Sequence, residues 1–331
     1  MALLITAMMV MGLLTGCGAA SDTATTAAPE DGTVVEEATE AAEEEEDPLA
    51  TGDAANDDPL NQDDIGEKEI LVVSFGTSFN DNRVATIGGI EKAIAAAYPD
   101  WSVRRAFTAQ IVIDHVAKFG ETIDNVEQAL QRARDNGVKQ LVVAPTHLMS
   151  GNEYDELTAT LAKYNADFEK IEISAPLLTS DEDKAAVAKI LIDITKDYDD
   201  GETAIVYMGH GTDHEQNKVY TEMEEILKAN GGENYFVGVV HDGAMPDLAT
   251  TLKKVQDANK YKKVVLRDMM VVAGDHANND MADENDPESW LSTFKAAGFE
   301  VTPVLEGLGQ VPEIQQIYVE HVGAAVDAIS K

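Results

Sequence analysis

Short apolar runs rich in β-branched residues alternate with amphipathic segments from residue 69 to the end of the chain, and this alternation constrains the fold most. Such runs are expected as strands buried on both faces, and the segments between them as helices that cover those faces. In the first half, strands are predicted at residues 69–75, 102–107, 140–145 and 170–177, with helices at 83–98, 111–119, 125–136 and 154–165. The pattern predicts a parallel sheet between layers of helices.

The second half of the chain repeats this plan. Strands are predicted within residues 203–214, 235–241, 262–276 and 300–309, with a closing helix from Pro312 to Lys331. Gly76-Thr77 and Gly211-Thr212 lie 135 residues apart, and Gly151 and Gly274 lie 123 apart. A shared period near 130 residues indicates duplication. The expected fold class is therefore α/β, with two similar Rossmann-like lobes at residues 68–200 and 201–331 and a cleft between them.

The N-terminus is predicted to carry an export signal. Residues 2–14 form an apolar stretch that is too short to span a membrane but suits the core of a signal peptide. The stretch runs into Leu-Thr-Gly-Cys, which resembles the lipobox of bacterial lipoproteins and predicts cleavage after residue 16 and acylation of Cys17. No Lys or Arg precedes the apolar stretch, and the alternative is a buried N-terminal helix with a stray cysteine. We expect an exported protein anchored to the outer face of a bacterial membrane.

Residues 17–67 are predicted to be a disordered acidic tether. From Gly18 to Glu67 there are 17 Asp and Glu residues, no Lys or Arg, and no apolar periodicity. Such a segment buries too little apolar surface to offset the entropy lost on ordering. The remaining chain is still acidic, with 44 acidic residues against 24 basic ones. This balance excludes nucleic acid as the expected partner, because phosphate binding needs a basic face.

Unusual polar residues follow the predicted strands. Glu153 and His276 come after corresponding strands of the two halves, and His210 stands between two glycines. Ligands of such folds bind beyond the carboxyl ends of the strands, so these three side chains are expected in the cleft. Two imidazoles and a carboxylate suit a divalent first-row metal, held in an open site.

Other chemistries have less support. Cys17 is the only cysteine, which leaves no intrachain disulfide, cysteine metal site or cysteine nucleophile. The phosphate-binding loop, the dinucleotide-binding fingerprint and the hydrolase nucleophile elbow are absent from the sequence. A Ser-His-Asp triad stays open. His115 and His321 are interpreted as ordinary helix residues, and His241 lies at the correct strand end but is weak evidence alone.

Several motifs together resemble one family, the anaerobic single-chain sirohydrochlorin cobaltochelatases of the class II chelatase group. The resemblance runs from about residue 69 to the end and rests on "LVVSFGTSFND", "RRAFT", "GNEYDEL", "MGHGTDH", "VAGDHANNDMA" and "GLG". It implies a two-lobed fold around a tetrapyrrole cleft. It also implies an active-site pair at His210 and His276, and a metal-binding glutamate at Glu153.

The resemblance implies insertion of Co²⁺ into sirohydrochlorin in anaerobic cobalamin biosynthesis, without ATP, with Fe²⁺ as the alternative metal. Because sirohydrochlorin carries eight carboxylates, Arg83, Arg104 and Arg105 are candidate substrate-binding residues. A second hypothesis is a lipid-anchored protein that binds tetrapyrrole, haem or metal for a transporter. Homo-oligomerisation is a further expectation.

Three further expectations concern the second half. Arg267-Asp268 is expected to interrupt the strand before His276. The polar side chains of Asn278, Asn279, Asp280 and Asp283 are expected to fix the loop and cap the following helix rather than bind metal. Acidic neighbours are expected to favour the charged imidazolium and to move the loss of activity in acid to higher pH.

Overall fold

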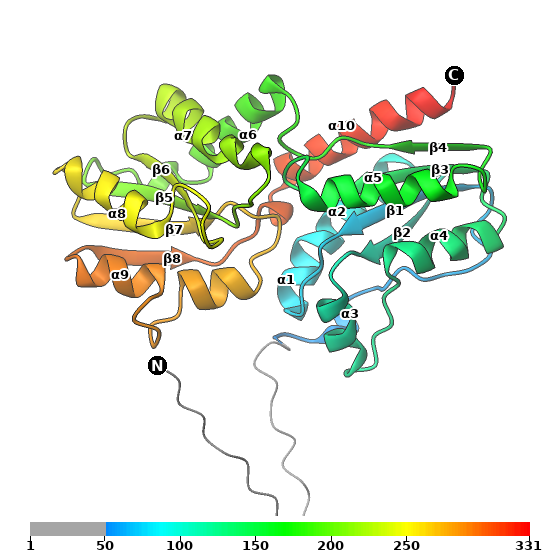
Figure 1. Cartoon of the computed structure of the whole chain (residues 1–331), viewed down its shortest axis with the longest axis horizontal. Coiled ribbons are helices and arrows are strands. Elements are labelled where there is room, and N and C mark those ends of the chain that lie inside the picture. Colours follow the sequence, from blue (N-terminus) through cyan, green and yellow to red (C-terminus); the bar gives the residue numbers. More distant parts are fainter. Residues whose placement is uncertain (1–50) are drawn as a thin grey trace, which may run out of the picture. The chain divides into compact units, whose positions relative to one another are not determined.

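The computed structural model describes residues 51–331, which form two sheets of identical topology (Figure 1). The predicted signal peptide, Cys17 and residues 17–50 lie outside the described residues. Each sheet has four strands, all of them parallel. The first has the order β2-β1-β3-β4 and the second β6-β5-β7-β8, which confirms the predicted duplication.

The strands occupy the predicted apolar runs. Those of the N-terminal lobe are β1 (Lys68–Ser74), β2 (Ser102–Phe107), β3 (Gln140–Pro145) and β4 (Lys170–Ile173). Those of the C-terminal lobe are β5 (Thr203–Gly209), β6 (Tyr235–Val239), β7 (Lys263–Asp268) and β8 (Glu300–Val304). Alternate residues of β1 face different cores, since Ile70 and Val72 belong to one cluster and Leu71 and Val73 to another. The central strands are therefore buried on both faces, as their composition predicted.

Helices cover both faces of each sheet. In the first half they are α1 (Asn80–Ala85), α2 (Ile87–Ala97), α3 (Gln110–Ala117), α4 (Val126–Asp135), α5 (Asn152–Tyr164) and α6 (Asp181–Asp193). In the second half they are α7 (Lys218–Gly231), α8 (Leu248–Asp257), α9 (Trp290–Ala296) and α10 (Pro312–Ile329). Within residues 51–331 no helix combines the length and apolar character needed to cross a bilayer.

The two halves exchange their last helices. α6 packs on α7 of the second lobe, and α10 returns to pack on α2, β3 and β4 of the first (Figure 1). The Tyr318 hydroxyl of α10 donates to the Thr146 carbonyl at 2.9 Å. The expected division at residue 200 instead placed α6 with the first lobe and α10 with the second. One apolar core is consequently shared by both lobes and includes Ile70 of β1 and Tyr207 of β5.

The structure differs from the expected tether at its C-terminal end, because residues 51–67 lie on the N-terminal lobe. Leu60 packs against the shared core, and Ile65 packs against the core on the other face of the sheet. The Gln62 side chain donates to the Val103 carbonyl at 3.2 Å, and the Ser102 hydroxyl donates to the Ile65 carbonyl at 2.7 Å. These contacts protect the edge strand β2. The few apolar residues among the acids were the signal for this ordering.

Arg267 and Asp268 do not interrupt their strand, contrary to expectation. They are the last two residues of β7 and pair with Tyr207 and Met208 of β5. Both are buried, and Arg267 binds the Glu306 carboxylate at 2.9 Å. Burial raises the pKa of Asp268 well above its usual range, which favours a neutral carboxyl group that a strand interior tolerates.

Candidate metal-insertion site

Three histidines meet at the carboxyl edge of the C-terminal sheet. His210 follows β5, His241 follows β6, and His276 follows β7, and these strands are neighbours in the sheet. The ring centroids of His210 and His276 lie 4.8 Å apart, and those of His210 and His241 lie 5.5 Å apart. The structure thus brings the predicted histidine pair together and places His241 beside His210. The position of His241 at a strand end was the sequence signal for this proximity.

Two glycines allow His210 to occupy this position. A β-carbon on Gly209 would overlap the Tyr220 ring, so no side chain fits there. Gly211 has φ of +86°, in the left-handed region that favours glycine, and a β-carbon there would lie 2.8 Å from the Val239 β-carbon. The Gly211 amide donates to the Tyr220 hydroxyl at 3.2 Å.

The hydrogen bond of His210 fixes which ring nitrogen carries the lone pair. Its Nδ1 lies 2.7 Å from the Gly211 carbonyl oxygen, which only accepts, so Nδ1 is the donor and neutral His210 has its lone pair on Nε2. Burial lowers the pKa of His210, and the charges of His276 and His241 act in the same direction, against the Gly211 carbonyl and the Glu153 carboxylate. The expected upward shift is therefore wrong for His210, because burial outweighs its acidic neighbours.

His276 is oriented by Asp280. The segment after β7 leads to a π-helical turn at Ala277–Met281. This turn begins directly after His276 and contains Asp280, so the side chains of these two residues lie on the same face. His276 Nδ1 lies 2.8 Å from the Asp280 carboxylate, so the lone pair of the neutral ring again falls on Nε2. The His276 side chain is 42% exposed. Both His210 and His276 therefore have a fixed tautomer, with the lone pair of the neutral ring on Nε2.

The polar loop around His276 is held by its own amides, as predicted, but the N-cap of the following helix α9 is Ser289 rather than one of the predicted residues. The Asn278 side chain donates to the Gly274 carbonyl at 2.8 Å, and the Asn279 side chain donates to Asp275 at 2.7 Å. Asp280 was grouped with these loop-fixing residues, and the structure gives it the more specific task of orienting the imidazole.

Glu153 belongs to the opposite lobe, in the first turn of α5. This turn contacts the loop after β5, since the Asn152 side chain donates to Asp213 at 2.8 Å and Asp155 lies 3.6 Å from His214 Nε2. Glu153 is exposed, and its charge acts on His210. It also lines a cavity of about 270 Å³ together with Glu127 and Glu156. Across residues 51–331, no three or more His, Cys, Asp or Glu side chains are arranged to enclose a metal ion.

His147, which follows β3 on the same edge of the N-terminal sheet, received no role from the sequence. Both its ring nitrogens are buried without a hydrogen-bond partner among the described residues. Burial lowers the pKa of His147 to about 4, against the attraction of Glu153. This imidazole is therefore neutral at physiological pH and lies within the field of the predicted metal-binding carboxylate.

The three predicted substrate-binding arginines do not present their charges to a ligand. Arg83, Arg104 and Arg105 are each at most 1% exposed. Their guanidinium groups form ion pairs with carboxylates of the same lobe, which are Asp57, Glu69, Glu91, Glu121 and Asp124. The assignment fails because buried arginines in an acidic chain pair internally.

The chain thus has two lobes with parallel sheets and an open imidazole pair at the carboxyl edge of the second sheet. Two solved structures share this fold at 13% identity: SirB from Bacillus subtilis with Fe³⁺ and the sirohydrochlorin chelatase SirB from B. subtilis subspecies spizizenii in complex with cobalt. The TM-scores are 0.56 and 0.52, over 80% of this chain and 98% and 97% of those chains. The chain belongs to the cobalt chelatase (CbiK) family, whose model matches residues 68–327.

Two curated relatives match most of their length. A sirohydrochlorin cobaltochelatase of Salmonella typhimurium is 32% identical over 262 residues, which cover 79% of this chain and 97% of that protein. The sirohydrochlorin cobaltochelatase CbiKC of Nitratidesulfovibrio vulgaris is 30% identical over 268 residues, with 80% and 92% covered. The residues that match the family model, 68–327, include His210, His241 and His276.

Proposed function

We propose that this chain inserts Co²⁺ into sirohydrochlorin, with His210 and His276 as the catalytic pair. The observation that carries the proposal is the 4.8 Å approach of the two rings at an open sheet edge, each with Nδ1 hydrogen-bonded and Nε2 available. Family membership and two relatives named sirohydrochlorin cobaltochelatase support the substrate and the metal.

The chemistry requires only what these residues supply. A planar macrocycle must release two pyrrole protons as the metal enters. A neutral imidazole can hold the cation through Nε2 or accept a proton there. Burial lowers the pKa of His210, so its ring stays neutral to a lower pH than a free imidazole does. His241 adds a third imidazole beside His210, and Glu153 adds negative charge from the other lobe. The proposed reaction uses no nucleotide.

The predicted export signal adds a location to this proposal. Acylation of Cys17 would place the chelatase at the outer face of a bacterial membrane, where imported metal or tetrapyrrole is its substrate. Mass spectrometry of the mature chain should show an acylated Cys17 at the N-terminus, and Cys17→Ala should release the protein from the membrane fraction. An unmodified Met1 at the N-terminus of a membrane-free protein would contradict this location.

A metallation assay tests the proposed activity. The shortened chain should keep all of residues 51–331, because residues 51–67 lie on the N-terminal lobe. Adding Co²⁺ and sirohydrochlorin should change the absorbance of the tetrapyrrole far faster than without protein, and competition with Fe²⁺ and Ni²⁺ should rank the metals. Stoichiometric binding of the tetrapyrrole without faster metallation would instead favour a carrier that serves a transporter.

A further inference from the structure

The contacts between the segment before β1 and the N-terminal lobe include a buried carboxylate, Asp57. Its side chain is 4% exposed. Asp57 Oδ2 accepts from Arg83 Nε at 2.7 Å and from Arg105 Nη1 at 2.6 Å, and Oδ1 accepts from Arg105 Nη2 at 3.0 Å. Burial alone would raise the pKa of Asp57, but the two arginines lower it below its usual value. Asp57 is therefore an ionised group shared by two buried guanidinium groups.

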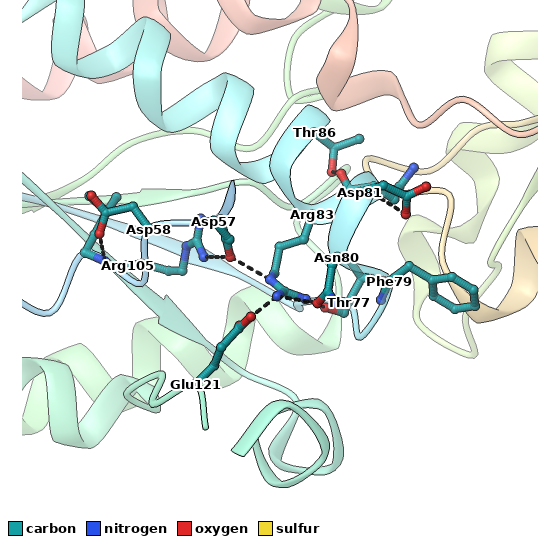
Figure 2. A network of polar contacts seen from close by, with 12 residues as sticks. Asp57, Asp58, Thr77, Phe79, Asn80, Asp81, Arg83, Thr86, Arg105 and Glu121 are labelled. Atoms are coloured by element: carbon teal, nitrogen blue, oxygen red, sulfur yellow. Dashed lines mark hydrogen bonds and ion pairs between the residues drawn. The ribbon is translucent and has the colours of Figure 1, made fainter. Parts of the chain in front are cut away.

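Arg83 connects this carboxylate to the loop that follows β1. Its Nη1 donates to the Thr77 carbonyl at 2.9 Å, and its Nη2 donates to Asn80 Oδ1 at 2.7 Å and to Glu121 at 2.6 Å. Figure 2 shows the guanidinium group between Asp57 on one side and Thr77 and Asn80 on the other. Every nitrogen of the guanidinium group has a partner, so its orientation is fixed.

The loop after β1 and the first turn of α1 together support the segment that carries His276. The Asn82 side chain accepts from the Ala273 amide at 2.9 Å across the lobes. A β-carbon on Gly274 would lie 3.0 Å from the Thr77 hydroxyl oxygen, so the Thr77 side chain lies close to the Gly274 backbone. His276 follows two residues later. Residues 76–82 are thus the surface of the N-terminal lobe against which the His276 segment lies.

We propose that Asp57 is a positioning residue for metal insertion. Its carboxylate orients Arg83, Arg83 fixes residues 77–80, and this loop holds Ala273-Gly274 and thereby the His276 ring. The proposal rests on the proposed function, since it assigns Asp57 a part in the same reaction. The C-terminal end of the acidic segment, residues 51–67, is then connected to the site through Asp57.

The test uses the full chain with Asp57→Asn, which keeps the size of the side chain and removes its charge. The kcat of Co²⁺ insertion should fall about tenfold, while the KM for sirohydrochlorin should change less than about twofold, as for a lost orienting contact. Hydrogen exchange of the amides at residues 271–278 should become faster, whereas exchange in β6 should not.

Asp124→Asn is the matched control. Asp124 is also buried in the N-terminal lobe, but it pairs with Arg104 and Arg132, and no hydrogen bond joins either of these to residues 76–82 in the described structure. This variant should lose thermal stability to a similar degree, yet keep kcat and the exchange rates at residues 271–278. An equal fall of kcat in both variants, or an unchanged kcat in Asp57→Asn, would overturn the proposal.

A second variant covers the case in which Asp57→Asn fails to fold. Asn82→Ala removes the acceptor for the Ala273 amide and leaves the buried ion pairs intact, so it should show the same fall in kcat. The double variant should lose little more than the worse single one, because both act through one contact; fully multiplicative losses would contradict this. If the unaltered chain inserts no Co²⁺, the proposed function fails, and the exchange rates alone still decide whether Asp57 orders the His276 segment.

Discussion

At the residue scale, the carboxylate of Asp280 controls the ring of His276. Asp280→Ala should lower metal insertion about 10- to 100-fold, the usual effect of losing a carboxylate that orients a metal-facing histidine. The fold should be retained, because the side chain is 43% exposed. Asn279→Ala is the control, since it removes a hydrogen bond of the same turn without touching the ring. Comparable losses in the two variants would mean that only the turn matters.

The pH dependence follows from His210. Since burial lowers its pKa, the neutral ring persists at lower pH than free imidazole, whose pKa is about 6.5. The rate of insertion at saturating metal should therefore fall with a midpoint below about 6.5 as pH decreases. A midpoint above that value, with the fold intact, would show that another group controls the reaction.

His147 makes a separate prediction about stability. Its pKa of about 4 in the folded protein is below the unfolded value of about 6.5, so the unfolded state binds more protons between these values. Stability is thus lost as pH falls through that window, by up to about 3 kcal/mol. His147→Leu should remove this loss, and urea unfolding at pH 5 and pH 8 measures it. A variant that gains no stability relative to the parent chain at pH 5 would contradict the shift.

The sequence was a good guide to exposed chemistry and a poor one to buried charge. The proximity of His210 and His276 could be predicted, because both residues were expected beyond the carboxyl ends of strands. Arg83, Arg104 and Arg105 could not be assigned correctly, because pairing with Asp57, Asp124 and three glutamates depends on contacts between residues 14 to 48 positions apart.

At the element scale, the turn after β5 depends on its glycines. Gly211→Ala should cost about 1–3 kcal/mol, since it combines a positive φ with crowding against Val239. Gly243→Ala is the control, because Gly243 also has positive φ but no atom lies within 4 Å of an added β-carbon. Denaturant unfolding should show the larger loss for Gly211→Ala. Equal losses of stability in the two variants would mean that the positive φ alone, and not crowding against Val239, explains the need for glycine at position 211.

Element boundaries show where sequence patterns stop being informative. The predicted helix at 83–98 is two helices, α1 and α2, because the chain turns at Thr86, whose hydroxyl donates to the Asn82 carbonyl at 2.6 Å. The strand predicted to reach residue 177 ends at Ile173, where the chain leaves for the other lobe. Hydrophobic periodicity predicts that a helix or strand exists. It does not predict which sheet a helix packs against, because the path of the chain between the lobes decides this, as for α6 and α10.

At the scale of the whole molecule, the exchanged helices make the lobes interdependent. One core includes residues of both lobes, and α10 is bound to the first through Tyr318. A chain of residues 51–331 should therefore unfold in a single transition, with equal calorimetric and van't Hoff enthalpies. Two resolved transitions would contradict a shared core.

The central claim is that a pair of neutral imidazoles inserts the metal. The most direct test is the rate of Co²⁺ insertion into sirohydrochlorin by the parent chain, His210→Ala, His276→Ala and the double variant, with circular dichroism to confirm folding. Each single variant should lose at least about tenfold, and the double variant should be little worse than the weaker single, because groups that act as a unit are not additive. Losses of less than about tenfold in correctly folded single variants would contradict the assignment.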